Sequence, residues 1–147
     1  MNLKDSNNGS KMNKEEIVKL LIKHEGMKLM PYHDSVGKLT IGVGRNLDDC
    51  GISSDEAEML LLNDIDRACY DLNTHLPWWK NLDCVRQMVL VDMAFNMGIF
   101  GLLTFKNTLA AIKAGDYPEA SILMLESKWA EQVGNRAVEL SKMMREG

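Results

Sequence analysis

Apolar positions recur at helical spacing along most of this chain. The first such segment contains Ile17, Leu20 and Leu21, which stand at i, i+3 and i+4. This spacing predicts a helix over residues 14–25. By the same reasoning, with capping residues as start and stop signals, further helices are expected at residues 55–72, 83–97, 105–113, 116–127 and 136–145. We therefore expect a mainly helical chain.

The spacing of apolar residues changes between the first two predicted helices. Two short runs with β-branched and aromatic residues are joined by the Asp-Ser-Val-Gly sequence of residues 34–37. Such runs, joined by turn-forming residues, predict a β-hairpin. A hairpin followed by a bundle of helices is an α+β fold with a strong helical excess. Residues 1–12 are polar and have almost nothing to bury, so we expect them to form a flexible tail.

Composition and charge are those of an ordinary globular protein. The 147 residues leave room for one domain, and 46% are hydrophobic against 26% charged. A net charge of −4 argues against a basic surface for nucleic acid, so we expect no nucleic-acid partner. The polar N-terminal stretch and the short apolar runs predict a cytoplasmic protein without membrane insertion.

Cysteines and histidines are few and widely spaced. They are Cys50, Cys69 and Cys84, and His24, His33 and His75. An odd cysteine count without close pairs, and histidines without metal-site spacing, predict reduced thiols and no metal. We expect no cofactor.

The candidate chemistry lies at the hairpin. Glu25 ends the first predicted helix, Asp34 follows nine residues later at the bend, and Thr40 stands on the returning strand. Nine extended residues would span about 30 Å, so only a hairpin can bring the two acids together. The helix dipole and apolar neighbours favour the protonated form of Glu25, whereas a polar turn keeps Asp34 ionised. One neutral acid and one carboxylate across a cleft can cleave a glycosidic bond.

Each of these residues also has an ordinary structural interpretation. Many helices end in Glu and many turns contain Asp, so an acid pair at this spacing can arise by chance. Physical reasoning on the residues alone therefore leaves catalysis and simple structural roles both open.

The surrounding residues resemble a known family. Glu25-Gly26, then Tyr32-His33-Asp34, then Gly-Lys-Leu-Thr-Ile-Gly-Val-Gly at residues 37–44 resemble the pattern E-G…Y-x-D…G-x-x-T-I-G-x-G of the phage-type lysozymes, glycoside hydrolase family 24. Further similar segments follow in the family's order at residues 54–58, 95–98, 104–109 and 127–137. The resemblance covers about residues 16–145.

The resemblance implies a lysozyme-like fold with two lobes. A small hairpin lobe would be joined to a helical bundle lobe by a long helix. The expected parts of one lysozyme domain, residues 13–147, are a hairpin lobe at about 26–54, a connecting helix at about 55–72, and a helical lobe made of 14–25 and 73–147.

The resemblance also implies roles for individual residues. Glu25 would be the general acid, and Asp34 and Thr40 would position and activate the attacking water, with inversion. Residues implied to bind substrate are Phe95, Asn96, Thr108, Asn135 and Arg136. Arg136 matches a family arginine that pairs with the catalytic Glu. Core packing for Phe95 and a place on a helix surface for Thr108 remain open alternatives, and for Trp129 we expect core packing.

Three departures from the family pattern stand out. Residues 45–52 form a shorter segment than in the longest members, so the small lobe is expected to be trimmed. Arg45 replaces a histidine that faces the cleft in some members, and Leu123 replaces an asparagine that contacts sugar. These changes bear on substrate contacts and leave the three catalytic positions filled.

The expected activity follows from the resemblance. It is an endolysin-type muramidase that hydrolyses the β-1,4 bond between N-acetylmuramic acid and N-acetylglucosamine in bacterial peptidoglycan and so lyses cells. We expect a monomer that needs a separate pore-former to reach the wall. The alternative is a peptidoglycan-binding module that keeps the lysozyme fold with weak turnover or none.

Overall fold

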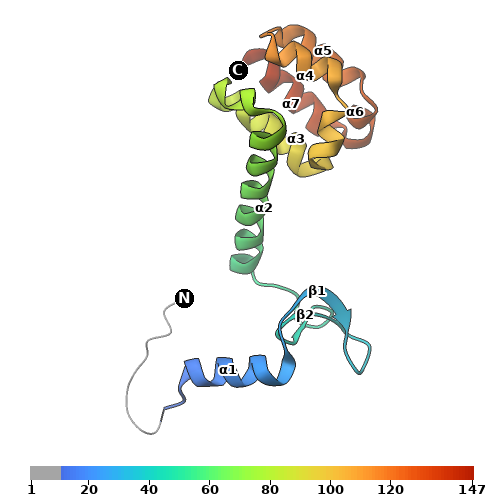
Figure 1. The fold of residues 1–147 in the computed structure, drawn as a ribbon. Coiled ribbons are helices and arrows are strands. Elements are labelled where there is room, and N and C mark those ends of the chain that lie inside the picture. The colour runs from blue at the N-terminus through green and yellow to red at the C-terminus, as the bar shows by residue number, and fades with distance from the viewer. Residues whose placement is uncertain (1–10) are drawn as a thin grey trace. The chain divides into compact units, whose positions relative to one another are not determined.

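The computed structural model describes residues 11–147, and these fall into two compact units. Unit 1 runs to Ala57 and unit 2 runs from Glu58 to Gly147. The described residues form seven α-helices and a small antiparallel sheet, coloured along the chain in Figure 1. The predicted α+β, mainly helical class is confirmed. The predicted lobe boundaries within one domain stay a prediction, and most of the predicted 1–12 tail lies outside the described residues.

Unit 1 begins with helix α1, Lys14–Glu25. Asn13 caps it, because its Oδ1 accepts hydrogen bonds from the backbone N–H groups of Glu15 and Glu16 at 2.9 and 3.2 Å. The helix stops at Gly26, which has φ +72° and donates its N–H to the carbonyl of Ile22. Glu25 is therefore the last helical residue, as the sequence predicts.

The sheet of unit 1 has the strand order β1-β2-β3, all antiparallel. Its strands are β1, Lys28–His33, β2, Leu39–Gly42, and β3, Arg45–Asn46. Thr40 of the central strand pairs with Tyr32 on one side and Asn46 on the other. The predicted hairpin is confirmed, whereas β3 was not predicted because a two-residue strand has no detectable alternation.

Helix α2, Ser54–His75, starts in unit 1 and continues into unit 2. Ser53 and Glu56 form the capping box that the sequence predicts, with each side chain accepting the other's backbone N–H at 3.0–3.1 Å. The helix extends three residues beyond the predicted end. It stops before Pro77, because the residue preceding a proline is disfavoured in the helical conformation.

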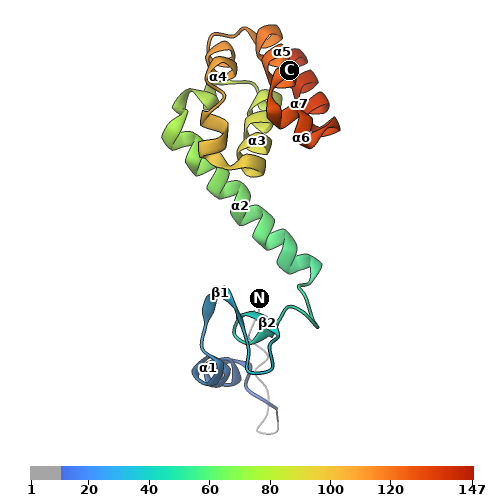
Figure 2. The same cartoon turned by 90° about the vertical axis from the view of Figure 1, so that its right-hand side faces the viewer.

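Unit 2 is a bundle of helices gathered around α3, as Figures 1 and 2 show. Its elements after α2 are the 3-10 helix η1, Pro77–Asn81, and helices α3, Cys84–Leu103, α4, Lys106–Lys113, α5, Tyr117–Glu126, α6, Lys128–Val133, and α7, Asn135–Glu146. Val89, Leu90 and Met93 of α3 are fully buried. Helix α3 therefore supplies a large part of the core of unit 2.

Two features of unit 2 differ from expectation. The first helical part of α3 ends at Gly98, as predicted, because Gly98 has the non-helical angles φ +76° and ψ 161°, and a second helical segment that was not predicted follows to Leu103. Burial of Ile99 and Leu102 in the core stabilises the extra turn. Helix α6 was not predicted at all because it is only six residues long, although Ser127 caps it and Gly134 ends it.

Helix α3 is also long and apolar enough, by length and composition alone, to cross a membrane. The sequence analysis expected no such segment. The core helix of a globular unit passes the same test, and six residues of α3 are buried in the core of unit 2. Its hydropathy is explained by that packing.

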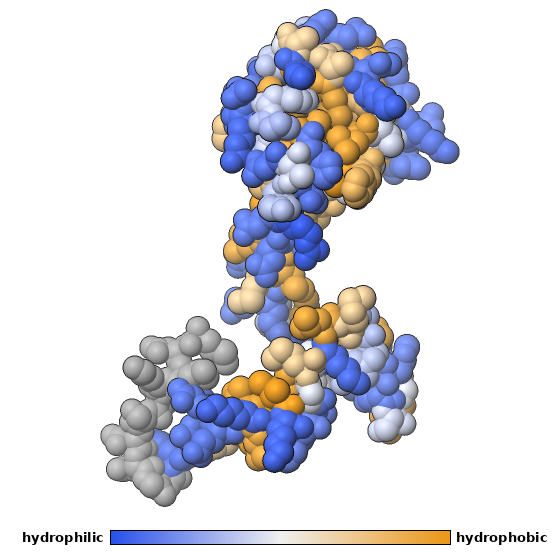
Figure 3. Space-filling model, viewed as in Figure 1, coloured by the Kyte–Doolittle hydropathy of each residue, from blue (hydrophilic) through white to orange (hydrophobic). Residues whose placement is uncertain are grey.

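Apolar side chains reach the surface in both units (Figure 3). In unit 1 they gather over α1, whose apolar residues are not covered by the hairpin. Leu29, Met30 and Val36 of the hairpin are more than three-quarters exposed. The hairpin is therefore held together by its ladder and polar contacts more than by a core of its own.

Candidate active site

Glu25 stands at the junction of α1 and the sheet. Its carboxyl end lies over Gly44, the glycine between β2 and β3. It accepts no hydrogen bond from any residue that the structure describes. The acid therefore lies at the end of its helix beside Gly44, and within the described residues its carboxyl oxygens have no hydrogen-bond partner.

Asp34 organises the hairpin turn with one of its two carboxylate oxygens. Its Oδ1 accepts the backbone N–H groups of Val36 and Lys38 at 3.0 and 2.8 Å. Its own backbone N–H donates to the carbonyl of Lys38 at 2.9 Å. Such side-chain bonds to the following backbone are the usual reason for Asp at a turn. Within the described residues Oδ2 accepts no hydrogen bond, so one basic oxygen remains available.

Thr40 is buried on the central strand, with an exposed fraction of 3%. Its hydroxyl donates to the carbonyl of Lys38 at 2.9 Å. Because the hydroxyl hydrogen is used in this way, the oxygen's remaining lone pairs can only accept hydrogen bonds. Asp34 and Thr40 are thus bonded to the N–H and the carbonyl of a single residue, Lys38, and the fold brings these two candidates together.

A short polar turn holds the strand that carries Thr40. Asp48 Oδ2 accepts the backbone N–H of Leu39 at 2.8 Å, and the N–H of Leu47 donates to the Leu39 carbonyl at 2.7 Å. Asp49 pairs with Lys38 Nζ at 3.1 Å. This turn lies within residues 45–52, the segment that is expected to be short.

Arg45 belongs to a separate contact. Its Nη1 lies 2.8 Å from Glu56 Oε1 and 3.2 Å from the carbonyl of Gly51, so it ties β3 to the start of α2. The hydrogen bond from Arg45, followed by those from Ser53, lowers the pKa of Glu56 to about 2. The same hydrogen bond raises the pKa of Arg45. Arg45 therefore makes an ion pair where other family members were expected to present a histidine to the cleft.

In unit 2, Asn96 lies beside Trp129. Its Oδ1 accepts the indole N–H of Trp129 at 2.8 Å and so links α3 to α6. The Trp129 ring is buried and meets Phe105 edge to face, with ring centroids 6.0 Å apart. The expected core role of Trp129 is confirmed. Asn96 has a structural task in addition to any contact with substrate.

A cavity in unit 2 brings together Arg136, Asp92 and Phe95. Arg136 forms an ion pair with Asp92 at 2.8 Å, and all three line a cavity of about 540 Å³. The predicted pairing of Arg136 with the catalytic Glu stays a prediction. Asn135, the first residue of α7, is exposed beside it. Sequence reasoning missed Asp92, although its position on the apolar spine helix was a signal.

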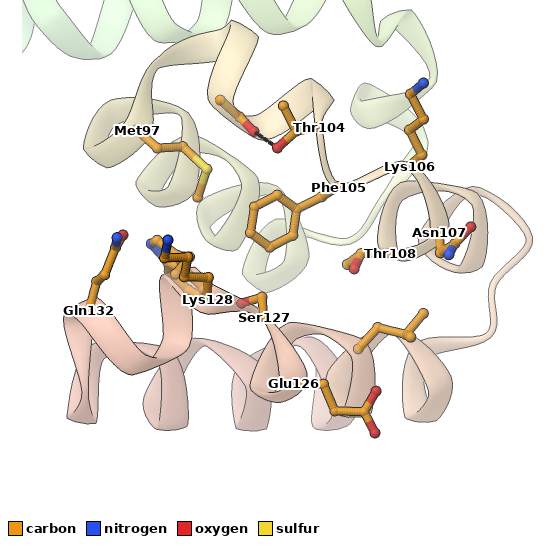
Figure 4. Close-up of a pocket in the computed structure, with 13 residues that line it drawn as sticks. Met97, Thr104, Phe105, Lys106, Asn107, Thr108, Glu126, Ser127, Lys128 and Gln132 are labelled. Atoms are coloured by element: carbon orange, nitrogen blue, oxygen red, sulfur yellow. Dashed lines mark hydrogen bonds between the residues drawn. The ribbon is translucent and has the colours of Figure 1, made fainter.

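Thr108 lines another cavity of unit 2, of about 710 Å³, between α3, α4, α5 and α6. Figure 4 shows Phe105, Thr108 and Ser127 directed toward a shared space, whereas Glu126 points away from it. Leu123 also lines this cavity. Thr108 is buried, so the alternative of a helix-surface position is wrong.

Comparisons with known proteins identify the family. The family model described as Phage lysozyme matches residues 22–145. The chain belongs to this family. The lysozyme fold, enzyme class and peptidoglycan substrate that the sequence resemblance implied are thereby confirmed.

Individual relatives of this phage-type lysozyme come from different sources. It is 29% identical to "Probable T4-type lysozyme 1" of Dictyostelium discoideum, over 88% of this chain and 94% of that protein. It is 28% identical to an "Endolysin" of Acyrthosiphon pisum secondary endosymbiont phage 1, over 80% of each chain. It is also 27% identical to "Pre-baseplate central spike protein Gp5" of Enterobacteria phage T4, over 89% of this chain but 28% of that protein.

Within this lysozyme, the roles assigned to individual residues remain predictions. Besides Asp92, sequence reasoning did not single out Lys38, whose backbone joins Asp34 to Thr40, or Asp48, whose side chain accepts the backbone N–H of Leu39. Backbone partners leave no signal in residue type, because almost any amino acid supplies the same N–H and carbonyl.

Proposed function

We propose that this lysozyme is an endolysin-type muramidase that hydrolyses the β-1,4 bond between N-acetylmuramic acid and N-acetylglucosamine. Glu25 is the general acid, and Asp34 with Thr40 holds the attacking water. The observation that carries the proposal is that Asp34 and Thr40 are both hydrogen-bonded to Lys38, Asp34 Oδ1 to its N–H and the Thr40 hydroxyl to its carbonyl. It leaves one carboxylate oxygen and one hydroxyl oxygen, both acceptors, for the two hydrogens of a water.

The proposed reaction is a single displacement. Protonated Glu25 donates its proton to the glycosidic oxygen as the bond from that oxygen to the anomeric carbon breaks. Water attacks the anomeric carbon from the opposite face, and Asp34 Oδ2 takes the proton that it loses. The products are a new reducing end with inverted configuration and a free hydroxyl on the other sugar. Protons return to Glu25 and leave Asp34 through solvent.

The proposed glycan-binding residues are in unit 2. Phe95 presents a half-exposed ring for stacking on a sugar face, and Arg136 and Asn135 offer donors beside it. The Thr108 cavity combines the hydroxyl residues Thr104, Thr108 and Ser127 with apolar lining residues, which suits the N-acetyl and lactyl groups of the glycan. Asn96 shares its carbonyl oxygen with Trp129, so its amide N–H₂ group is the part proposed to reach substrate.

The test is an assay of purified peptidoglycan for clearing and for released reducing ends. Glu25→Gln and Asp34→Asn are each expected to abolish release while binding to the wall persists. NMR of the first-formed product should show the inverted anomer. Binding by the unaltered protein without release of reducing ends would instead support the module that keeps the fold without turnover.

The predicted monomer, cytoplasmic location and separate pore-former are part of the same proposal. Sedimentation of the purified protein and fractionation of producing cells, with and without a co-expressed pore-former, would test them.

A further inference from the structure

Gly44 makes an unusually close approach to Glu25. A Cβ atom built on Gly44 would lie 3.1 Å from Glu25 Oε2, 3.3 Å from its Cδ and 3.4 Å from its Cγ. Ordinary contacts between carbon atoms are about 3.5–4.0 Å. A side chain at position 44 would therefore crowd the carboxyl end of Glu25, which would have to move by a few tenths of an ångström.

The Glu25 side chain makes no hydrogen bond or ion pair with any residue that the structure describes, and α1 ends at this residue. Its carboxyl end lies beside Gly44, in space that this glycine leaves open. Gly44 itself is fixed, because it lies between β2 and β3 and β3 is paired with the strand that carries Thr40.

We propose that Gly44 is a positioning residue for the proton donor: its lack of a side chain lets the Glu25 carboxyl lie over the β2–β3 turn. The inference rests on the proposed role of Glu25. A methyl group at position 44 would have two effects. It would displace the carboxyl from the turn, and it would exclude water from one face of the carboxyl, which disfavours the ionised form.

The chain offers a matched control in Gly42. Gly42 and Gly44 have nearly the same left-handed backbone, with φ +70° and +69°. A Cβ on Gly42 would meet no atom within 4 Å. Gly42→Ala and Gly44→Ala therefore share the strain of alanine at positive φ, and only Gly44→Ala touches Glu25.

The experiment compares kcat, KM and their pH dependence for the two variants on purified peptidoglycan. We expect Gly44→Ala to lower kcat roughly 10- to 100-fold below Gly42→Ala, because small displacements of a catalytic group have effects of that size. The alkaline limb of its pH profile should move to higher pH, while KM stays close to that of the control. Equal kcat values and superimposable pH profiles for the two variants would overturn the proposal.

A stability measurement covers the case in which Gly44→Ala folds poorly. Removing the Glu25 side chain should relieve the crowding, so Gly44→Ala should lower Tm in a Glu25→Ala background only as much as Gly42→Ala does. An excess loss of Tm that is the same with and without the Glu25 side chain would show that the contact is not the cause.

Failure of the positioning role of Gly44 can be distinguished from failure of the proposed function. Full activity of Glu25→Gln would remove the proton-donor role itself. Inactive Glu25→Gln combined with identical behaviour of Gly42→Ala and Gly44→Ala would leave that role standing and reject only the positioning role of Gly44.

Discussion

Asp34 and the backbone of Lys38 are bonded in both directions, since Asp34 Oδ1 accepts the Lys38 N–H at 2.8 Å and the backbone N–H of Asp34 donates to the Lys38 carbonyl at 2.9 Å. The same carbonyl accepts the hydroxyl of Thr40. The turn therefore fixes the orientation of the free Asp34 oxygen before any substrate binds. Preorganised polar groups of this kind need little rearrangement during reaction.

Replacing Thr40 with valine tests the hydroxyl. Valine keeps the shape and the β propensity but offers no lone pair to the water and no donor to the Lys38 carbonyl. We expect wall lysis to fall by roughly 100-fold or more and the unfolding free energy to fall by about 1 kcal/mol, the usual net value of one hydrogen bond. Thr40→Ser keeps the hydroxyl and should retain most activity. A valine variant as active as the serine variant would contradict the assigned role.

The Arg45–Glu56 pair predicts a particular pH dependence of stability. The pKa of Glu56 is lowered from its usual 4.5 to about 2 in the folded protein, chiefly by the hydrogen bond from Arg45. A lowered pKa stabilises the fold above pH 4.5, and this contribution is lost as the pH falls from about 5 to about 2. Urea unfolding of unit 1 followed across this range should show a smaller acid-induced loss for Glu56→Gln. Because both side chains are well exposed, added salt should reduce the difference.

Asn96 is expected to matter for stability as well as for binding. Asn96→Leu leaves the buried indole N–H of Trp129 without its acceptor, which costs about 1–3 kcal/mol. Asn96→Asp keeps an acceptor oxygen and should recover most of that loss. Thermal unfolding monitored by tryptophan fluorescence would measure both. Equal stability of the leucine variant and the unaltered protein would mean that the hydrogen bond contributes nothing.

Arg86 joins the beginning of α3 to the end of α7. Its guanidinium donates to the carbonyls of Met144 and Arg145 at 2.7 and 3.0 Å and lies 3.6 Å from the centre of the Tyr117 ring. Lysine cannot reproduce this planar set of contacts. We expect Arg86→Lys to lower the unfolding free energy by about 1–3 kcal/mol without affecting the chemistry of unit 1. Denaturant titration and the reducing-end assay, run on the same samples, would check both parts.

Local sequence signals predicted the parts of the fold that local rules control. The bounds of α1 were predictable because helical spacing ends at a glycine, and the capping box marked the start of α2. Gly98 interrupts α3 with non-helical backbone angles, as the local stop signal predicts. The second helical segment after Gly98 was not predictable, because burial of Ile99 and Leu102 depends on distant helices.

In the candidate site, too, local signals were predictable and contacts between distant residues were not. Glu25, Asp34 and Thr40 could be proposed from their motif, since their residue types carry the chemistry. Arg136 and Asp92 lie on different helices and are 44 residues apart in the sequence, so no spacing rule predicts that they pair. The contact between Glu25 and Gly44 was likewise invisible, because the sequence shows a glycine without showing what lies against it.

The hydrogen bond that Asp48 accepts from the peptide N–H of Leu39 has a consequence for how this turn can evolve. Every amino acid except proline carries that N–H, so the bond places no other demand on the side chain at position 39. Position 48, in contrast, must keep an acceptor of the right length. Among descendants that keep this turn, mutational drift should therefore be broad at position 39 and narrow at position 48.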